Sequence, residues 1–560
     1  MGIPVSDIAT TTAGGFEVPE PIINGPFDEP TAYWELREGA PPVKQAGRRP
    51  AGYWYRDPRA NRDTAGSSRG VWREMRLVNL IRDRVAQWRK DGRPGISGTT
   101  LELFAWWDRE GRQPLLFFAQ CEAVETLIFL NEARQDYLTG IQIPRDEPSP
   151  ERISEGFVAF RRLCAKMATG TGKSTVAAMI AAWSILNKVA DKADARFSDT
   201  VLIVCPNVTI RSRLGELDPT QGEASLYRTR DLVPPTMMAD LAKGRVIIVN
   251  WHVFEPQQPA GSAGARVNRA GVPQTRTEWI VIGSKMTTAR GSRYFTPEAY
   301  GAAVAAGQIE VIREETGGDG LLRKAMIRST RYVESDSALV RRVLGEAGGK
   351  QNVLVINDEA HHAYRIPPKI DDDQDELGLD EDEIEDEEAD EKEATVWVEG
   401  LDRVNRICGI NQCVDLSATP YYLGRMGDAT NTVFPWAVSD FSLTDAIESG
   451  LTKVPTLVAR GPTGQVLEAY FNIGGWILPK LTAAERGTKR GSPKPEAILK
   501  WAHTPVRILA GMWAEKLDEW AKEDDLSPRC SSWWPRTSGS QRPYMTGSPR
   551  TTSRRRSRRR

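Results

Sequence analysis

Long apolar runs are missing from this sequence. Its 560 residues contain no stretch of 18 consecutive apolar side chains. A stretch of that length is close to the minimum for a membrane-spanning helix. The first residues, Met1 to Asp7, also lack the basic and apolar regions of a secretory signal. We therefore expect a cytoplasmic protein with no membrane partner.

Paired cysteines are missing as well. The six cysteines are scattered without a Cys-x-x-Cys pair, and four of them lie in apolar segments. We interpret them as reduced core thiols. Cys408 and Cys413 have no second pair of ligands nearby, which leaves a zinc site there as the minor alternative.

No excess of one charge marks the whole chain, because the formal net charge is -1. Two segments are nevertheless strongly charged. Residues 371–393 hold 16 acids and one lysine, and residues 529–560 hold 10 arginines and no acid. The rest of the chain is mildly basic, which is compatible with nucleic-acid binding. The acidic segment is predicted to be a disordered, solvated loop inserted in a domain.

The N-terminal region has little periodicity. Residues 1 to about 70 are rich in Pro, Gly and aromatic residues, which indicates an irregular arm. Residues 71–88 then place apolar side chains at helical spacing with arginines opposite, which predicts an amphipathic helix. The arginine face is expected to be solvated, with nucleic-acid contact as the minor alternative. We assign residues 1–100 as an N-terminal accessory region.

From about residue 100 to 420, short β-branched apolar runs alternate with helical stretches. These runs are too short for helices and are apolar on both faces, as is typical of strands in a parallel sheet covered on both sides. The sequence therefore predicts an α/β fold with a parallel sheet flanked by helices. The runs are Val201–Cys205, Arg245–Val249, Trp279–Ile282, Val353–Ile356 and Cys413–Leu416.

A glycine-rich loop, MATGTGKS, covers residues 167–174 between an apolar run and a helical stretch, 175–186. A phosphate-binding loop needs small residues so that backbone N–H groups can approach the phosphates, a lysine for the phosphate oxygens, and a hydroxyl for magnesium. Lys173 and Ser174 supply the last two. The loop differs from the general pattern in having Met167 at the position of the first glycine.

A second motif follows the apolar run at 353–356. The string Asp358-Glu359-Ala360-His361 places two carboxylates at the end of a predicted strand. Such a strand can deliver Asp358 to a magnesium ion and Glu359 to a water in line with the γ-phosphate. A zinc site at His361 and His362 is the minor alternative, because adjacent histidines in a strand or a turn are expected to point apart and no further ligand is near.

Together these motifs resemble a DEAH-type superfamily 2 helicase, and in detail the Res subunit of type III restriction enzymes. The string Ser417-Ala418-Thr419 is similar to the family's coupling motif, and Gln120 stands where the family has an adenine-reading glutamine. The segments after two further strands resemble the family's DNA-contacting motifs, with Pro206, Thr209, Asn250 and His252 as the residues concerned. All of these motifs occur in the family's order.

The resemblance implies a RecA-like fold of the P-loop NTPase class, ATP and Mg²⁺ as cofactors, and DNA and a methyltransferase (Mod-type) subunit as partners. It implies catalytic roles for Lys173, Glu359 and His361, and magnesium ligation by Ser174 and Asp358. Ser417 and Thr419 are implied in coupling. The implied nucleotide contacts are Gln120, Thr169, Gly170, Thr171, Gly172, Lys173, Ser174 and Thr175.

The family's second-lobe motif, Gln-x-x-Gly-Arg-x-x-Arg, and its nuclease motif are missing after residue 455. We assign residues 101–435 to the ATPase lobe, with an insertion at about 255–345, and residues 436–528 to a linker and the start of an incomplete second lobe. Residues 529–560 form an Arg/Ser-rich tail that we expect to be disordered. A frameshift or truncation explains the change at Ser527-Pro528 more simply than a nucleic-acid-binding tail does.

Two functions follow from these motifs. The first is the ATP-hydrolysing helicase or translocase part of a type III restriction endonuclease. The alternative is a truncated, weakly hydrolysing protein that binds ATP and nucleic acid and has a regulatory role or none. Because second-lobe arginines contribute about 10³–10⁵ in rate in related phosphate-loop enzymes, we expect ATP binding with slow hydrolysis and no DNA cleavage.

Overall fold

The computed structural model describes most of the chain between residues 18 and 453. The described ranges are 18–36, 40–55, 70–255, 272–283, 293–305, 309–317, 320–345, 351–366, 381–422, 426, 429–453, and the separate residues 481, 482, 485, 496, 497, 499–501 and 503. Contacts divide the chain into two units, Phe16–Val454 and a second made of Met1–Gly15 and Pro455–Arg560. Nearly all described residues belong to the first unit. The tail at 529–560 lies outside the described residues.

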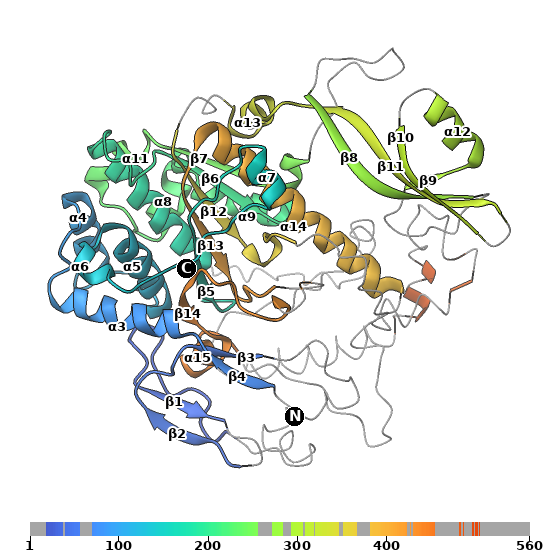
Figure 1. Cartoon of the computed structure of the whole chain (residues 1–560). Helices are drawn as coiled ribbons and strands as arrows, with labels where there is room; N and C mark the ends of the chain where they lie inside the picture. The colour runs from blue at the N-terminus through green and yellow to red at the C-terminus, as the bar shows by residue number, and fades with distance from the viewer. Residues whose placement is uncertain are drawn as a thin grey trace, which may run out of the picture. The chain divides into compact units, whose positions relative to one another are not determined.

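The centre of the first unit is a six-stranded sheet in which every neighbouring pair is parallel (Figure 1). Its strand order is β14-β5-β13-β12-β6-β7. The bounds are β5 Arg162–Met167, β6 Thr200–Cys205, β7 Arg245–Asn250, β12 Val353–Asp358, β13 Ile410–Ser417 and β14 Ala437–Phe441. This all-parallel sheet confirms the predicted α/β fold class and is compatible with a RecA-like fold.

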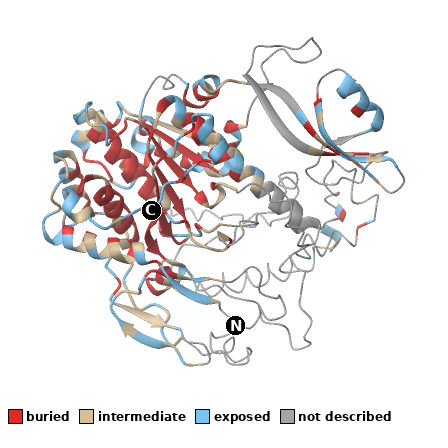
Figure 2. Cartoon of the chain, viewed as in Figure 1, coloured by how far each residue is buried: buried red, intermediate tan, exposed pale blue. Residues whose placement is uncertain are grey.

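Helices cover both faces of the sheet. Along β12, Leu354 and Ile356 pack into one hydrophobic cluster, whereas Val353 and Val355 pack into another, because successive side chains of a strand point to opposite faces. The first cluster contains residues of α3 (Arg76–Lys90), α4 (Gly98–Trp107), α5 (Phe118–Glu132) and α8 (Lys173–Ala190). The second contains residues of α13 (Asp336–Leu344) and α14 (Glu381–Cys408). Figure 2 shows these two buried layers around the strands.

The connections contain shorter elements. The short α-helices are α6 Gln135–Leu138, α7 Pro150–Ser154, α9 Val208–Leu214, α10 Leu226–Thr229, α11 Met238–Leu241 and α15 Leu443–Glu448. The 3-10 helices are η1 Gly215–Leu217, η2 Pro219–Ala224, η3 Pro235–Met237, η4 Trp251–Phe254 and η6 Ala360–His362.

The N-terminal region is more regular than the sequence predicts. It contains two antiparallel ribbons, β1 (Ala32–Glu35) with β2 (Val43–Ala46), and β3 (Gly52–Tyr55) with β4 (Val71–Glu74). The helix predicted at 71–88 begins later, at Arg76. Val71 and Trp72 are β-branched and aromatic and pair with β3 instead, so the cross-strand partner decides their conformation.

The six-stranded sheet of the first unit continues beyond residue 435, the predicted end of the ATPase lobe. Strand β14 pairs with β5 in the same sheet, and the backbone N–H of Ala168 donates to the carbonyl of Phe441. The sequence from residue 437 therefore completes the first sheet rather than starting a linker. No alternation of apolar and polar residues in Ala437–Phe441 distinguishes this edge strand from the strands of a following domain.

A separate four-stranded sheet occupies the segment between η4 and α13. Its order is β10-β11-β8-β9, with bounds β8 Val272–Ile282, β9 Arg293–Phe295, β10 Ile309–Thr316 and β11 Leu322–Val333, and α12 (Pro297–Ala305) contributes to its core. The prediction that Trp279–Ile282 belongs to the six-stranded parallel sheet is wrong, because Trp279, Ile280 and Val281 pair antiparallel with β11 and Ile282 pairs with β9 of this separate sheet. A short apolar run does not reveal its partner strand.

The acidic segment predicted to be disordered is helical in its second half. Helix α14 starts at Glu381, whereas residues 367–380 lie outside the described residues. The helix is held by its C-terminal half, where Ala394, Trp397 and Leu401 are buried. Glu and Ala have high helix propensity, so the acidic turns can extend a helix that is anchored elsewhere.

Five cysteines fall within the described residues and all five are free thiols, as predicted. Cys530 lies outside those residues. In the part of the chain that the structure describes, no helix is both long and apolar enough to cross a membrane.

A buried ion network crosses the sheet. The guanidinium of Arg162 donates to Asp415 (Nε to Oδ2, 2.9 Å), to Asp146 (Nη1 to Oδ2, 2.8 Å) and to the carbonyl of Ala363 (2.7 Å). Asp415 also accepts from Asn357 (2.8 Å) and from the indole of Trp436 (2.8 Å). The network therefore ties β5, β12 and β13 together below their carboxyl ends.

Candidate functional site

The glycine-rich loop joins the end of β5 to the start of α8. Gly170 and Gly172 have φ values of +91° and +88°, a region that side chains other than glycine rarely adopt. The hydroxyl of Thr171 is buried and donates to the carbonyl of Ala168 (2.7 Å). Thr169 and Gly170 are exposed at the outer edge of the loop. The loop is therefore a tight turn closed by its own side chain.

The first amides of α8 are available for a ligand. The N–H of Thr175 donates back to the carbonyl of Gly172 (2.9 Å). Among the described residues, no hydrogen-bond acceptor takes the N–H groups of Gly172, Lys173 or Ser174. Free amides and the positive end of the helix dipole favour an anion at this position.

Gln120 lies against this turn from the first turn of α5. Its Oε1 accepts a hydrogen bond from the N–H of Phe117 (3.0 Å), so it caps the helix to which it belongs. A Cβ placed on Gly172 would be 2.1 Å from Nε2 of Gln120. Gln120, which is predicted to contact the adenine base, is therefore held beside the loop. Its position leaves no room for a side chain at residue 172.

The two carboxylates of the second motif, the predicted magnesium ligand Asp358 and the predicted catalytic Glu359, lie at the end of β12. Lys173 Nζ is 3.0 Å from Glu359 Oε1, although 185 positions separate them in the sequence. Strand β13 lies between β5 and β12, and Lys173 is the first residue of α8, the helix that follows β5. Glu359 has φ +53° and ψ +49°, a left-handed conformation that costs about 1–3 kcal/mol outside glycine and recurs at functional sites.

His361 connects this pair to the end of β13. Its Nδ1 is 3.0 Å from Oγ of Ser417 and 3.5 Å from Oε2 of Glu359. Oγ of Ser417 also accepts the N–H of Thr419 (3.1 Å). The prediction that the two adjacent histidines point apart is wrong, because the ring centroids of His361 and His362 are 4.3 Å apart. The residues lie in a 3-10 turn, and in this turn the two rings come together.

Burial and neighbouring charges shift two pKa values at the site. Burial, followed by the charge of Glu359, raises the pKa of Asp358 to about 6. Burial, followed by the charge of His362, lowers the pKa of His361 to about 4. At neutral pH the site therefore holds an ionised Asp358 and a neutral His361. Burial makes the ionised form of Asp358 less favourable than it would be in water.

Ser174 and Asp358, the predicted magnesium ligands, lie at the same edge of the sheet, in the first turn of α8 and at the end of β12. Across the described residues, no group of three His, Cys, Asp or Glu side chains could hold a metal ion alone. Two protein ligands suit Mg²⁺, which is usually bound through one or two carboxylates together with phosphates and water. A bound cation would stabilise the ionised form of a desolvated carboxyl such as Asp358.

The four residues predicted to contact DNA share one edge. Pro206 and Thr209 follow β6, and Asn250 and His252 end and follow β7. The two strands are adjacent and parallel, so their carboxyl ends coincide. Thr209 and His252 are exposed, and the ring of His252 stacks on Trp251 with a centroid distance of 3.8 Å.

The motifs miss one contact to the loop. The hydroxyl of Thr452 donates to the carbonyl of Thr169 (2.8 Å), and the carbonyl of Leu451 is 3.4 Å from a Cβ placed on Gly170. No local pattern marks these residues, which reach the loop only because β14 pairs with β5 and brings the following chain to the same edge.

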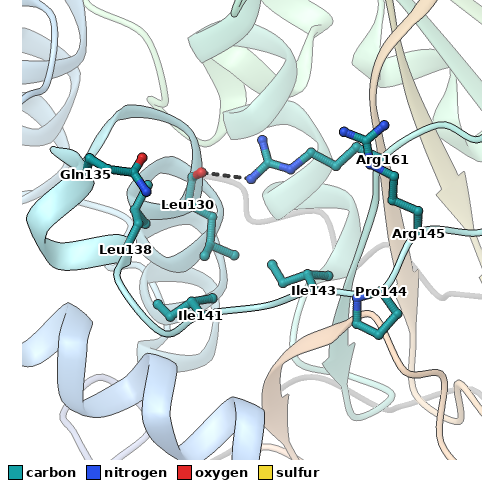
Figure 3. Close-up of a pocket in the computed structure, with 8 residues that line it drawn as sticks. All are labelled: Leu130, Gln135, Leu138, Ile141, Ile143, Pro144, Arg145 and Arg161. Atoms are coloured by element: carbon teal, nitrogen blue, oxygen red, sulfur yellow. Dashed lines mark hydrogen bonds between the residues drawn. The ribbon is translucent and has the colours of Figure 1, made fainter.

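A cavity of about 250 Å³ lies away from this site (Figure 3). It is next to Arg161, just before β5 begins, whereas the glycine-rich loop follows the end of β5. Its lining residues are Leu130, Gln135, Leu138, Ile141, Ile143, Pro144, Arg145 and Arg161.

Comparisons with protein-family models, with curated proteins and with solved structures found no match to this chain.

Proposed function

We propose that this chain binds and hydrolyses ATP with Mg²⁺ and acts as the helicase or translocase part of a type III restriction enzyme. In this proposal DNA is the polymer on which it acts, and a Mod-type methyltransferase subunit is its partner. The observation that carries the ATP part is the 3.0 Å approach of Lys173 to Glu359 at the free amides of α8.

The roles of the loop residues follow from their chemistry. Lys173 would bind phosphate oxygens together with the amides of Gly172 and Ser174, because each supplies an N–H donor at the positive end of α8. Glu359, which pairs with Lys173 through one carboxylate oxygen, would accept a proton from a water beside the terminal phosphate. Ser174 and Asp358 would hold the magnesium ion, which supplies charge neutralisation for the phosphates.

The coupling role proposed for Ser417 is supported by its contact with His361. A change at Glu359 would reach β13 through His361, since this imidazole is close to both Glu359 and Ser417. The DNA part of the proposal rests on the resemblance of the β6 and β7 ends to family motifs and on their shared edge. The Mod-type partner rests on the resemblance alone.

Binding of a fluorescent ATP analogue to purified Lys173→Ala tests the ATP site. Hydrogen bonds to charged groups contribute about 1.5–3 kcal/mol, so we expect binding about 10- to 150-fold weaker than in the parent chain. Lys188→Ala is the matched control, because Lys188 lies in the same helix but donates to the carbonyl of Asp194. Equal affinity of the Lys173→Ala chain and the control would refute the assignment.

Glu359→Gln separates binding from hydrolysis. The amide keeps the shape of the side chain but is a poor proton acceptor, so ATP and Mg²⁺ should still bind while phosphate release stops. Glu399→Gln, in a partly exposed pair with Arg152, is the control. Phosphate release at the parental rate, measured with and without DNA, would show that Glu359 does not position the water.

A further inference from the structure

The cavity of Figure 3 combines an aliphatic wall with two arginines. Its volume is about 250 Å³, and the aliphatic wall consists of Leu130, Leu138, Ile141 and Ile143. Leu130 is buried in the hydrophobic core that contains α5 and α8, and the other three side chains pack against that core. The wall is therefore continuous with the core of the first unit.

Two antiparallel segments place the arginines next to each other. Asp146 and Phe160 form an isolated antiparallel bridge, so Arg145 and Arg161, the next residues along the two segments, are neighbours across it. Successive side chains of extended segments point to opposite faces. Asp146 and Phe160 are accordingly buried, whereas Arg145 is exposed and Arg161 is half-buried. Both arginines line the cavity.

A buried carboxylate holds the segment that carries Arg145. Asp146 accepts hydrogen bonds from Arg162 (Nη1 to Oδ2, 2.8 Å) and from Arg365 (Nε to Oδ1, 2.8 Å). The carboxylate that follows Arg145 in the sequence is thus paired with two other guanidinium groups. Asp146 therefore holds the backbone at residue 145, while its own charge is paired away from the cavity.

Two hydrogen bonds orient the guanidinium of Arg161. Its Nη1 donates to Oδ1 of Asn131 (3.0 Å), and its Nη2 donates to the carbonyl of Leu130 (2.8 Å) near the end of α5. A guanidinium has five N–H donors, so three remain after these two bonds. Both acceptors are neutral groups. The side chain is therefore held in place with donors left for a ligand.

The charge of the cavity favours an anion. None of its lining residues is an acid, and no Asp or Glu in the described part of the chain makes an ion pair with Arg145 or Arg161. Like charges on facing residues of antiparallel segments destabilise each other. Burial, followed by the charge of Arg145, lowers the pKa of Arg161. A ligand with negative charge would relieve this repulsion.

The volume limits the ligand to a small molecule. A cavity of about 150 Å³ can hold benzene, and drug-sized ligands occupy about 300–1,000 Å³. The volume of about 250 Å³ lies between these sizes. The aliphatic wall suits a short apolar body, and guanidinium donors suit the oxygens of a carboxylate or a phosphate.

We propose that this cavity binds a small amphipathic anion, with its head group on Arg145 and Arg161 and its apolar body against the aliphatic wall. A carboxylate and a phosphate ester present the same oxygen acceptors, so the experiment uses one probe of each kind. The proposal does not depend on the proposed ATP site, because Arg161 precedes β5 whereas the glycine-rich loop follows it.

Equilibrium dialysis of the full chain against radiolabelled octanoate and octyl phosphate, below the concentrations at which they form micelles, tests the site. At least one of the two should bind. Neutral octanol should bind at least tenfold more weakly than the better probe, because it lacks the charge. Acetate and inorganic phosphate should also bind more weakly, because each buried CH₂ contributes about fourfold in affinity. An excess of ATP should leave binding of the probe unchanged.

Arg145→Met gives the sharpest measurement. Arg145 is exposed and makes no hydrogen bond or ion pair within the described ranges, so the variant should fold, which its melting temperature checks. It should bind the better probe at least tenfold more weakly, and Arg145→Lys, which keeps the charge, should bind more tightly than the methionine variant. Arg134→Met is the matched control, because Arg134 pairs with Asp136 (2.6 Å) and lies outside the lining.

Four results would overturn the proposal. The first is no binding of either probe by the parent chain, and the second is binding by Arg145→Met within twofold of the parent. The third is octanol binding as tightly as the better probe, which would show that the arginines take no part. The fourth is inorganic phosphate binding as tightly, which would show an anion site that does not use the aliphatic wall.

Discussion

Replacing Arg162 by Met tests the buried ion network that joins the strands beneath the candidate site. The change removes the arginine partner of Asp415, leaves Arg365 as the remaining partner of Asp146, and leaves the carbonyl of Ala363 without this donor. Arg162 and Asp415 are both fully buried. Water cannot replace the lost hydrogen bonds without opening the core.

The size of the effect follows from this burial. Removing one partner of a buried ion pair costs about 3–5 kcal/mol, because the remaining charge stays desolvated. Asp415 keeps its hydrogen bonds from Asn357 and Trp436, which places the expected loss within this range and not above it. Burial already raises the pKa of Asp415, and losing Arg162 should raise it further.

The pH dependence of this loss has a definite sign. In the Arg162→Met chain, the folded state should hold a proton on Asp415 at pH values where the unfolded chain releases it. The loss in free energy of unfolding, relative to the parent, should therefore be smaller at pH 5 than at pH 8. Urea unfolding followed by circular dichroism at both pH values measures the difference in the free energy of unfolding.

Arg134→Met is the matched control. Arg134 pairs with Asp136 at 2.6 Å, but both side chains are 58% exposed, and exposed pairs contribute about 0–1 kcal/mol. The double change Arg162→Met with Asp415→Asn should cost less than the sum of the single changes. A loss below about 1 kcal/mol for Arg162→Met, equal to that of Arg134→Met, would refute the reasoning.

Two further predictions concern the loop and the magnesium ligand. Gly172→Ala should lower both stability and ATP affinity, because its Cβ would be 2.1 Å from Gln120. The control is Gly156→Ala, whose Cβ would enter open space at φ +89°, so thermal melts should show only the cost of the backbone conformation. Similar losses of ATP affinity in the two variants would contradict this prediction. Because the pKa of Asp358 is raised to about 6, its contribution to stability is present at low pH and is lost as the pH rises through 6. Magnesium bound to Asp358 should favour the ionised carboxylate and so reverse this pH trend. The magnesium dependence of ATP-analogue binding should therefore weaken from pH 7.5 to pH 5 in the parent and stay the same across this range in Asp358→Asn. Equal pH profiles of the two chains would argue against magnesium binding by Asp358.

Local sequence patterns predicted the strands that carry the candidate site. The apolar run at 353–356 and the carboxylates after it lie where they were expected, at the end of β12. The glycine-rich loop lies between β5 and α8 for a local reason as well, since its two glycines adopt positive φ and Lys173 begins the helix. These features depend on residues that are neighbours in the chain.

Other predictions failed because the deciding residues are distant in sequence. Val71 and Trp72 have the apolar spacing of the helix that follows, but their pairing with β3 makes them a strand. The acidic turns of α14 continue a helix whose buried half begins near Ala394. In each case a tertiary contact outweighs the local composition.

The sequence by itself determined the α/β class, the apolar strands and the residue types of the candidate site, because periodicity and short motifs are local properties of the chain. Only the tertiary structure decided that β13 separates β5 from β12, that Lys173 reaches Glu359, and that β14 closes the edge of the sheet. The physical reason is that strand order and buried ion pairs such as that of Arg162 with Asp415 come from packing between segments hundreds of residues apart.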